Sequence, residues 1–214
     1  MPVSTLIPAY NEEKTIGPIL KVLSNIPLID EIIVVSDGST DNTALIAKKL
    51  GAKVIELPQN MGKGAALKKG LDACNSDIIL MLDADLIGLN ETHITKLLKP
   101  LLDNQYDMSV GVFDRGRFST DLAQRIAPYL SGQRAIRKHI IDDMKDTMEK
   151  TGYGIEVALT LYAKKEKIRV DWVRLRGLSH VTKEEKYGLF NGFNKRIKMY
   201  WQICRSLTFK LVKD

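Results

Sequence analysis

The chain has 214 residues, of which 44% are hydrophobic and 27% are charged. This composition predicts one folded domain and excludes a disordered or low-complexity chain. No apolar run approaches the ~18 residues of a membrane-spanning helix, and the first residues lack a basic stretch and a cleavage signature. We therefore expect a cytoplasmic protein that is neither secreted nor membrane-spanning. Cys74 and Cys204 match no metal or redox spacing, which favours reduced thiols.

Short apolar runs alternate with helical patterns along the first 82 residues. Continuous apolar runs are typical of parallel strands buried on both faces, and apolar positions three or four apart are typical of helices. Strands are predicted at Val3–Ile7, Glu31–Val35, Lys53–Leu57 and Asp77–Leu82, with helices at Thr15–Leu23, Thr43–Leu50 and Gly64–Ala73. This alternation predicts an α/β fold with a mostly parallel sheet flanked by helices.

The second half has a less regular pattern. It predicts a strand at Met108–Phe113, helices at Leu122–His139 and Ile155–Lys164, and a strand at Ile168–Leu175. We divide the chain into a domain over residues 1–188 and a C-terminal helix over residues 189–214.

The C-terminal helix carries almost all of the net charge. Its six basic residues and one acidic residue give +5 of the total of +6, which leaves the first 188 residues with +1. A domain with so little excess charge lacks the basic face of a nucleic-acid binder, so no nucleic-acid partner is expected. The apolar positions of the segment have helical spacing: Leu189, Phe193, Ile197, Tyr200, Trp201, Cys204, Leu207 and Leu211. A basic amphipathic helix with Trp and Tyr suits a membrane interface, and it equally suits packing on the domain or on a second copy in a homodimer.

Polar clusters follow the strands of the first half. They span residues 8–13, 36–41, 60–64 and 83–85. In open α/β sheets ligands bind beyond the carboxyl ends of the strands, so these clusters are expected to meet at one edge.

The cluster Asp83-Ala84-Asp85 follows the apolar run that ends at Leu82. Burying unpaired carboxylates is costly, and a divalent cation bridging them to phosphates removes that cost. Mg²⁺ and Mn²⁺ prefer oxygen ligands of this kind. An isolated Asp-x-Asp is more often a surface turn or helix cap, but its position after a buried strand favours the metal site.

Gly62-Lys63-Gly64 opens a predicted helix, where backbone amides and an ammonium group attract anions. A flexible loop is an equally good interpretation of these residues alone. Asp37 lies nearest the end of its strand, whereas Ser39, Thr40 and Asp41 are better explained as turn and cap residues. The sequence lacks G-x-G-x-x-G and G-x-S-x-G, which argues against a dinucleotide-binding dehydrogenase and an α/β-hydrolase. A phosphate-and-metal site remains.

These four clusters, in this order and spacing, resemble the nucleotide-sugar-binding half of a family-2 glycosyltransferase with the GT-A (Rossmann-like) fold. Segments 130–135, 152–156 and 177–180 resemble the glucosyl-3-phosphoglycerate synthase family, and the first two are also similar to dolichyl-phosphate mannose synthases. The resemblance spans roughly residues 3–181.

The resemblance implies a role for each donor-site residue. The base and ribose pocket would be lined by Pro8, Ala9, Tyr10 and Glu12. Asp37 would contact the uracil and Lys63 would face the diphosphate. Asp83 and Asp85, with Ala84 between them in the donor-binding motif, would hold Mg²⁺ or Mn²⁺ with the donor diphosphate. His180 would supply a further metal ligand.

The resemblance also implies where catalysis and acceptor binding occur. Glu156 would lie near the sugar, and with Asp85 it forms the predicted catalytic pair. In an inverting enzyme this carboxylate could take the proton of the acceptor hydroxyl, and in a retaining enzyme it could orient the sugar. A helix-start glutamate without a catalytic role is the alternative. Arg117 and Thr120 would bind the phosphate of the acceptor, and a solvated basic loop is the alternative for their segment. Arg134 would bind the acceptor phosphate or approach the diphosphate.

The function expected from these residues is metal-dependent transfer of a hexose from a UDP-sugar, with UDP-glucose as the expected donor. The acceptor would bear a phosphate, such as 3-phosphoglycerate or a polyprenyl phosphate, and a membrane-lying tail would favour the lipid. One alternative is a sugar-phosphate nucleotidyltransferase, which would begin with a Gly-rich phosphate loop in place of residues 8–13. Another is a membrane-surface or nucleic-acid-binding module that depends on the tail.

Overall fold

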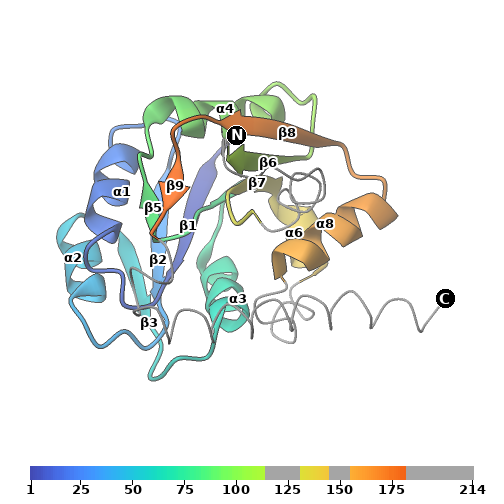
Figure 1. Cartoon of the computed structure of the whole chain (residues 1–214). Coiled ribbons are helices and arrows are strands. Elements are labelled where there is room, and N and C mark those ends of the chain that lie inside the picture. Colours follow the sequence, from blue (N-terminus) through green and yellow to red (C-terminus); the bar gives the residue numbers. More distant parts are fainter. Residues whose placement is uncertain (114–130, 145–154, 182–214) are drawn as a thin grey trace, which may run out of the picture.

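A computed structural model of the chain describes residues 1–113, 131–144 and 155–181 (Figure 1). A seven-stranded sheet with the strand order β3-β2-β1-β4-β7-β6-β8 forms the centre of the fold. Its strands are β1 Val3–Ala9, β2 Glu31–Ser36, β3 Lys53–Glu56, β4 Ile78–Met81, β6 Met108–Phe113, β7 Arg134–Arg137 and β8 Val170–Leu175.

Helices cover both faces of the sheet and bury two apolar clusters. The described helices are α1 Ile16–Leu23, α2 Thr43–Lys49, α3 Lys63–Ala73, α4 Glu91–Leu102, α6 Lys138–Asp142 and α8 Ile155–Lys165. Side chains of α1, α2 and α4 belong to one cluster with one face of the strands. Side chains of α3, α6 and α8 belong to the second cluster on the opposite face. The result is a three-layer α/β arrangement, which confirms the predicted fold class (Figure 1).

The first half of the sheet agrees with the prediction. Strands β3, β2, β1 and β4 pair in parallel, and every predicted strand and helix of residues 3–82 is present within two residues of its expected ends. Strands β1 and β4 are buried on both faces, and β4 is fully buried along its length, whereas β3 at the edge of the sheet is exposed or partly buried. Continuous apolar runs therefore predicted these strands correctly.

The helix predicted at Leu122–His139 is wrong over residues 131–137. Arg134–Arg137 forms β7, which pairs antiparallel with β4 on one side and with β6 on the other. Ala135 and Ile136 point to opposite faces, because the first belongs to one apolar cluster and the second to the other. Pairing on both sides and burial on both faces outweigh the local helical pattern, and helix α6 begins only at Lys138. Residues 122–130 lie outside the described part.

Helix α4 and a small second sheet have no counterpart among the predicted elements. Asn90 caps α4, and its side chain forms a capping box with His93. The second sheet pairs β5, Leu86–Ile87, antiparallel with β9, Ser179–His180. Figure 1 shows these two short strands side by side, in front of β1 and β2. They link the segment after β4 to the last described residues.

No helix in the described ranges is long and apolar enough to cross a bilayer. The tail over residues 189–214, with its predicted amphipathic helix, lies outside these ranges.

Candidate active site

Hydrogen bonds connect the four polar clusters at the carboxyl edge of the parallel strands. The first and second clusters meet where the Asn11 side chain accepts a hydrogen bond from the Thr40 backbone, 2.8 Å away. Asp37, in the second cluster, accepts from the backbone of the third cluster. Lys63, in the third cluster, binds Asp83 in the fourth. The prediction that these clusters share one edge is confirmed.

The segment over residues 8–13 is held by the turn that follows β2. The Glu12 backbone donates to Thr43 Oγ1 at 2.8 Å, and the Glu13 backbone donates to Asp41. Ser39 accepts from the Asn11 backbone. These bonds support the structural explanation of Ser39, Thr40 and Asp41. The pocket residues proposed in the same segment lie here too: Ala9 is buried, and Pro8, Tyr10 and Glu12 are partly exposed.

Asp37 is nearly fully buried, with 4% of its surface exposed. One carboxylate oxygen accepts from the Met61 backbone at 2.7 Å, and the other accepts from the Gly62 backbone at 2.9 Å. The neighbouring turn lies so close to the same loop that a Cβ on Gly38 would collide with the backbone of Gln59 and Asn60. Asp37 therefore fixes the loop that precedes Lys63, and its contact with uracil stays a prediction.

Lys63 joins two carboxylates that come from distant parts of the chain. It is the first residue of α3, and its Nζ lies 2.5 Å from Asp83 Oδ1 and 2.5 Å from Glu156 Oε1. Glu156 is the second residue of α8 and is 6% exposed. The N-terminal ends of α3 and α8 thus bring an ammonium group and a carboxylate next to Asp83, two residues after the end of β4.

Burial and charge act in opposite directions on these groups. Burial alone lowers the pKa of Lys63, but the carboxylates of Asp83 and Glu156 outweigh it and raise that pKa well above its ordinary value. Burial alone raises the pKa of Asp83, and the Lys63 ammonium outweighs it and lowers that pKa. Lys63 therefore stays protonated and Asp83 stays ionised at neutral pH.

Asp83, Asp85 and His180 form a cluster that could hold a metal ion. One ligand atom from each lies within 4.8 Å of the others, and all three residues are partly exposed. His180 Nδ1 lies 3.9 Å from Asp85 Oδ1. Two carboxylates and an imidazole suit Mn²⁺, and the oxygen donors suit Mg²⁺ as well. The structure brings together the three residues that the sequence assigned to a metal.

The small second sheet explains how His180 reaches the aspartates. His180 pairs with Leu86 across β5 and β9, and the Val181 backbone donates to the Asp85 carbonyl at 3.1 Å. The ring of Phe113 meets the His180 ring edge to face, with centroids 4.5 Å apart. The imidazole is therefore positioned by both backbone pairing and ring packing.

Arg134 lies at the first position of β7 and is fully buried. Its Nε donates to the Ser131 carbonyl at 2.8 Å. Burial lowers its pKa to about 10, and the nearby Glu156 and Asp83 carboxylates oppose that shift. The guanidinium thus balances the acidic groups from within the core, and its direct contact with an acceptor phosphate stays a prediction.

Gln133 also contacts the site, and no role was predicted for it. Its Nε2 donates to Asp83 Oδ2 at 2.7 Å. In the sequence, its segment stands out only through the resemblance over residues 130–135, because a single Gln does not by itself indicate a catalytic role. Arg117 and Thr120, the other two predicted acceptor ligands, lie outside the described residues.

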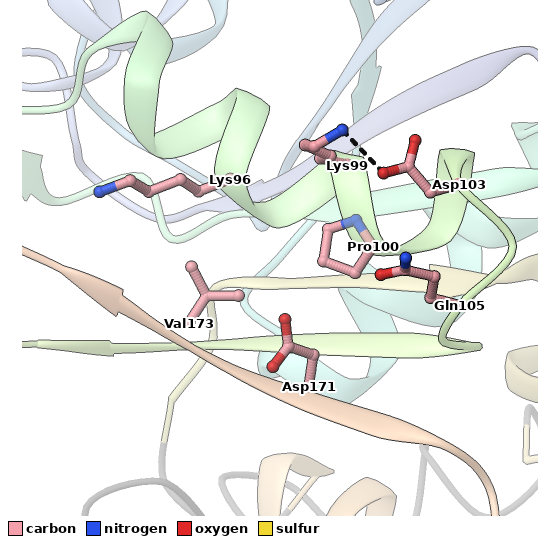
Figure 2. A pocket seen from close by; sticks show the side chains of 7 residues that line it. All are labelled: Lys96, Lys99, Pro100, Asp103, Gln105, Asp171 and Val173. Carbon is pink, nitrogen blue, oxygen red and sulfur yellow. Dashed lines mark hydrogen bonds and ion pairs between the residues drawn. The ribbon is translucent and has the colours of Figure 1, made fainter.

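A hollow between α4 and β8 lies apart from these residues (Figure 2). It has a volume of about 300 Å³, and Lys96, Lys99, Pro100, Asp103, Gln105, Asp171 and Val173 line it. Its one drawn interaction joins Lys99 to Asp103 at 2.7 Å, an exposed pair one helical turn apart. Such pairs contribute little, and none of the predicted site residues faces this hollow.

Comparisons with known proteins agree with this geometry. Residues 4–157 match the family model described as glycosyl transferase family 2. The chain is 30% identical over 196 residues to glucosyl-3-phosphoglycerate synthase of Mycobacterium tuberculosis, which covers 74% of this chain and 60% of that protein. The chain thus spans about three-fifths of the length of this relative.

Crystal structures of the same mycobacterial synthase have similar folds. One, in complex with Mn²⁺, UDP and glucosyl-3-phosphoglycerate, gives a TM-score of 0.77 at 25% identity and covers 96% of this chain and 78% of that chain. Another, with Mn²⁺, UDP-glucose and phosphoglyceric acid, gives 0.68 at 27% identity and covers 84% and 71%. The family match extends over most of the described residues, and it includes the loop at Lys63, both aspartates and Glu156. The chain belongs to glycosyl transferase family 2.

Proposed function

We propose that this chain transfers glucose from UDP-glucose to a small phosphate-bearing acceptor, with 3-phosphoglycerate as the acceptor to test first, in a reaction that depends on Mg²⁺ or Mn²⁺. The observation that carries the proposal is the cluster of Asp83, Asp85 and His180, whose ligand atoms lie within 4.8 Å of one another beside Lys63. The ligands named for the similar mycobacterial synthase support the choice of donor, acceptor and metal.

Asp83, Asp85 and His180 are the residues that would hold the cation. When bound there, a divalent cation would supply positive charge to the donor diphosphate, which leaves as part of UDP. The side chains of all three are between 20% and 32% exposed, so ligand atoms remain accessible from solvent. The donor set fits a cation that prefers oxygen and nitrogen ligands.

Lys63 would assist at the diphosphate. Its ammonium lies at the N-terminus of α3, where the helix dipole also favours an anion. Both contributions are present before the donor arrives, so they stabilise the charge that develops as the sugar bond breaks.

Glu156 would act on the sugar side of the same ammonium. Its carboxylate forms an ion pair with the Lys63 ammonium, 2.5 Å away. As a base it would take the proton of the acceptor hydroxyl, and as an electrostatic group it would stabilise positive charge on the sugar. The anomeric configuration of the product, read by NMR, distinguishes these two roles.

A transfer assay tests the proposal. The full chain is incubated with UDP-glucose, Mn²⁺ and either 3-phosphoglycerate or a short polyprenyl phosphate in detergent, and products are identified by mass spectrometry. We expect glucosylated phosphoglycerate and its loss when EDTA is added. Asp85→Ala should reduce the rate by about 100-fold or more, because the cation loses a ligand. Asp103→Ala, which removes an exposed carboxylate at the C-cap of α4, serves as the matched control.

Each other result has a defined meaning. If product forms only with the polyprenyl phosphate, the acceptor is the lipid and not 3-phosphoglycerate, while the proposed donor and metal stand. Transfer that persists in EDTA, or in Asp85→Ala at the control rate, would contradict the metal site.

For the lipid acceptor, the tail over residues 189–214 is proposed to lie on a membrane surface and bring the catalytic domain to it. The support is its sequence, with six basic residues and apolar positions at helical spacing. Co-sedimentation of the full chain with anionic and neutral vesicles tests this. A tail that instead packs on a second copy would leave the chain in the supernatant as a dimer, which light scattering detects.

A further inference from the structure

Gln133 is fully buried, and hydrogen bonds at both ends of its side-chain amide fix the orientation of that amide. Its Nε2 donates to Asp83 Oδ2 at 2.7 Å, and its Oε1 accepts from Ser131 Oγ at 3.1 Å. The reversed amide would place Oε1 against the carboxylate of Asp83, where two acceptors would repel each other. The hydrogen-bond network therefore determines which end of the amide faces Asp83.

The backbone around Gln133 is fixed as firmly as its side chain. The Gln133 carbonyl accepts from the Gly111 backbone at 2.8 Å, and the Gln133 backbone donates to Ser131 Oγ at 3.3 Å. Gly132 packs directly on the carboxylate of Asp83, because a Cβ on this glycine would lie 2.7 Å from Asp83 Cγ. The segment over residues 131–133 thus forms one wall of the Asp83 site.

The carboxylate of Asp83 has different donors on its two oxygens. Lys63, at the start of α3, binds Oδ1, and Gln133, just before β7, binds Oδ2. Both bonds together fix the rotation of the carboxylate about its Cβ–Cγ bond. Gln133 does this without charge, whereas a second ammonium or guanidinium at this position would repel a divalent cation.

Packing alone does not account for an amide here. A buried amide is costly unless its hydrogen bonds are made, and an apolar side chain of similar length would fill the same space without that cost. Residues that hydrogen-bond to metal ligands orient those ligands and typically change metal affinity by about 10- to 100-fold when removed.

We infer that Gln133 is a positioning residue that orients Asp83 for the divalent cation. It acts through Asp83 and does not itself contact the cation. The inference rests on the proposed metal-dependent function of the site, and it adds a residue that determines how much Mn²⁺ the protein needs.

The test measures UDP affinity by calorimetry across a series of Mn²⁺ concentrations and again in EDTA. Gln133→Met keeps the length of the side chain but removes the donor. We expect about 10- to 100-fold more Mn²⁺ for half-maximal enhancement of UDP binding, with UDP affinity in EDTA unchanged. Saturating Mn²⁺ should restore the wild-type affinity, because a weakened site still fills by mass action.

The matched control is Ser109→Ala. Ser109 lies in β6 and is fully buried, and its hydroxyl donates to the Leu97 carbonyl at 2.5 Å on the side of α4. This variant loses a buried hydrogen bond in the same sheet without touching Asp83. It should lower the thermal midpoint while its Mn²⁺ requirement stays that of the wild type, which separates lost stability from lost positioning.

A Mn²⁺ requirement of Gln133→Met equal to that of the wild type would overturn the inference. If that variant does not fold, Ser131→Ala decides, since it releases the other end of the amide and should shift the Mn²⁺ requirement in the same direction by less. An unchanged requirement in Ser131→Ala would then overturn it. Absence of any Mn²⁺-dependent UDP binding in the wild type would instead refute the proposed function.

Discussion

At the residue scale, the ammonium of Lys63 allows two carboxylates to lie close together in a partly buried site. Asp83 and Glu156 each approach it to 2.5 Å, and their side chains are 20% and 8% exposed. Without it, two like charges of low exposure would face each other, and neither could be fully hydrated.

Replacing Lys63 by Met should therefore destabilise the protein. We expect the free energy of unfolding at pH 7 to fall by about 3 kcal/mol, because breaking a buried ion pair leaves its partners uncompensated. Urea denaturation measures this. Lys99→Met is the control, since Lys99 pairs with Asp103 on an exposed helix face and should change stability by about 0.5 kcal/mol or less. Equal effects of the two variants would contradict the account.

Asp37 should act on the donor through the loop before Lys63. Its two oxygens accept from two backbone amides, and Asn in its place has only one acceptor oxygen. We expect Asp37→Asn to weaken UDP binding about tenfold, the cost of one lost charge-assisted hydrogen bond. Hydrogen exchange at the amides of Met61 and Gly62 should also become faster.

A variant at the opposite end of the sheet provides the comparison. Asp30 accepts a single bond, from the Val3 backbone at 2.6 Å, which Asn can also accept. Asp30→Asn should leave UDP affinity unchanged. If Asp37→Asn weakens UDP binding while exchange at Met61 and Gly62 stays slow, the residue acts on the nucleotide directly.

The sequence predicted the three residues of the candidate metal cluster, His180 through the resemblance, but not the residues that contact Asp83. Asp83 and Asp85 follow a buried strand, a pattern that is visible without a structure. Gln133 and Gly132 gain their meaning only from distance, because 50 residues separate Gln133 from Asp83 in the chain. The contact of Asp37 with the loop before Lys63 was hidden for the same reason.

At the element scale, α3 lies unusually close to the sheet. Gly70 faces β1 and β2, and a Cβ there would collide with side-chain carbons of Leu6 and Val35. The same helix begins at Lys63, so the distance of α3 from the sheet also determines how far the Lys63 ammonium lies from Asp83.

Gly70→Ala should consequently affect both stability and donor binding. We expect the free energy of unfolding to fall by about 1–3 kcal/mol from overpacking, together with weaker UDP binding as α3 moves outward. Lys69→Ala, at an exposed position of the same helix, should change stability by about 0.5 kcal/mol or less. Thermal denaturation and UDP titration check both, and a Gly70→Ala variant as stable as the wild type would contradict the close packing.

Elements with a strong local pattern were predictable, and those defined by pairing were not. Most of the parallel strands at residues 3–82 are continuous apolar runs, which made them predictable. Strand β7 has only four residues and lies next to a helical pattern, so its partners β4 and β6 determine its state. The two-residue strands β5 and β9, which place His180, are too short to carry a periodic signal.

At the scale of the whole molecule, ion pairs connect β6, β7 and β8 at the end of the sheet opposite the site. Asp107, just before β6, accepts two bonds of 2.8 Å from Arg169, which precedes β8, and one of 3.4 Å from Arg137 at the end of β7. The hydrogen bonds and charge of Arg169 lower the pKa of Asp107 below its ordinary value, against the opposing effect of burial.

This shift predicts a pH dependence of stability. Because the folded pKa of Asp107 is lower than the unfolded pKa, its contribution is present at neutral pH and is lost as the pH falls through the acidic range. Asp107→Asn should therefore be less stable than the wild type at pH 7, and the difference should shrink towards pH 3, about a unit below the ordinary pKa of Asp. Urea denaturation at both pH values measures this, and a difference that does not change with pH would contradict it.

The tail shows where inference from sequence ends for the molecule as a whole. Its charge and apolar spacing are clear from the residues, yet the same pattern suits a membrane, the domain or a second copy. The membrane and the second copy lie outside the chain, so vesicle binding and light scattering decide among the three.

The most direct test of the central claim is calorimetric titration of UDP-glucose into the full chain with Mn²⁺ and again after EDTA. We expect UDP-glucose to bind with Mn²⁺ and to lose about tenfold or more in affinity when the cation is removed. The reason is that the cation supplies the positive charge that joins Asp83, Asp85 and His180 to the diphosphate. UDP-glucose that binds equally well in EDTA, or does not bind at all, would contradict the assignment of this edge of the sheet as a metal-dependent donor site.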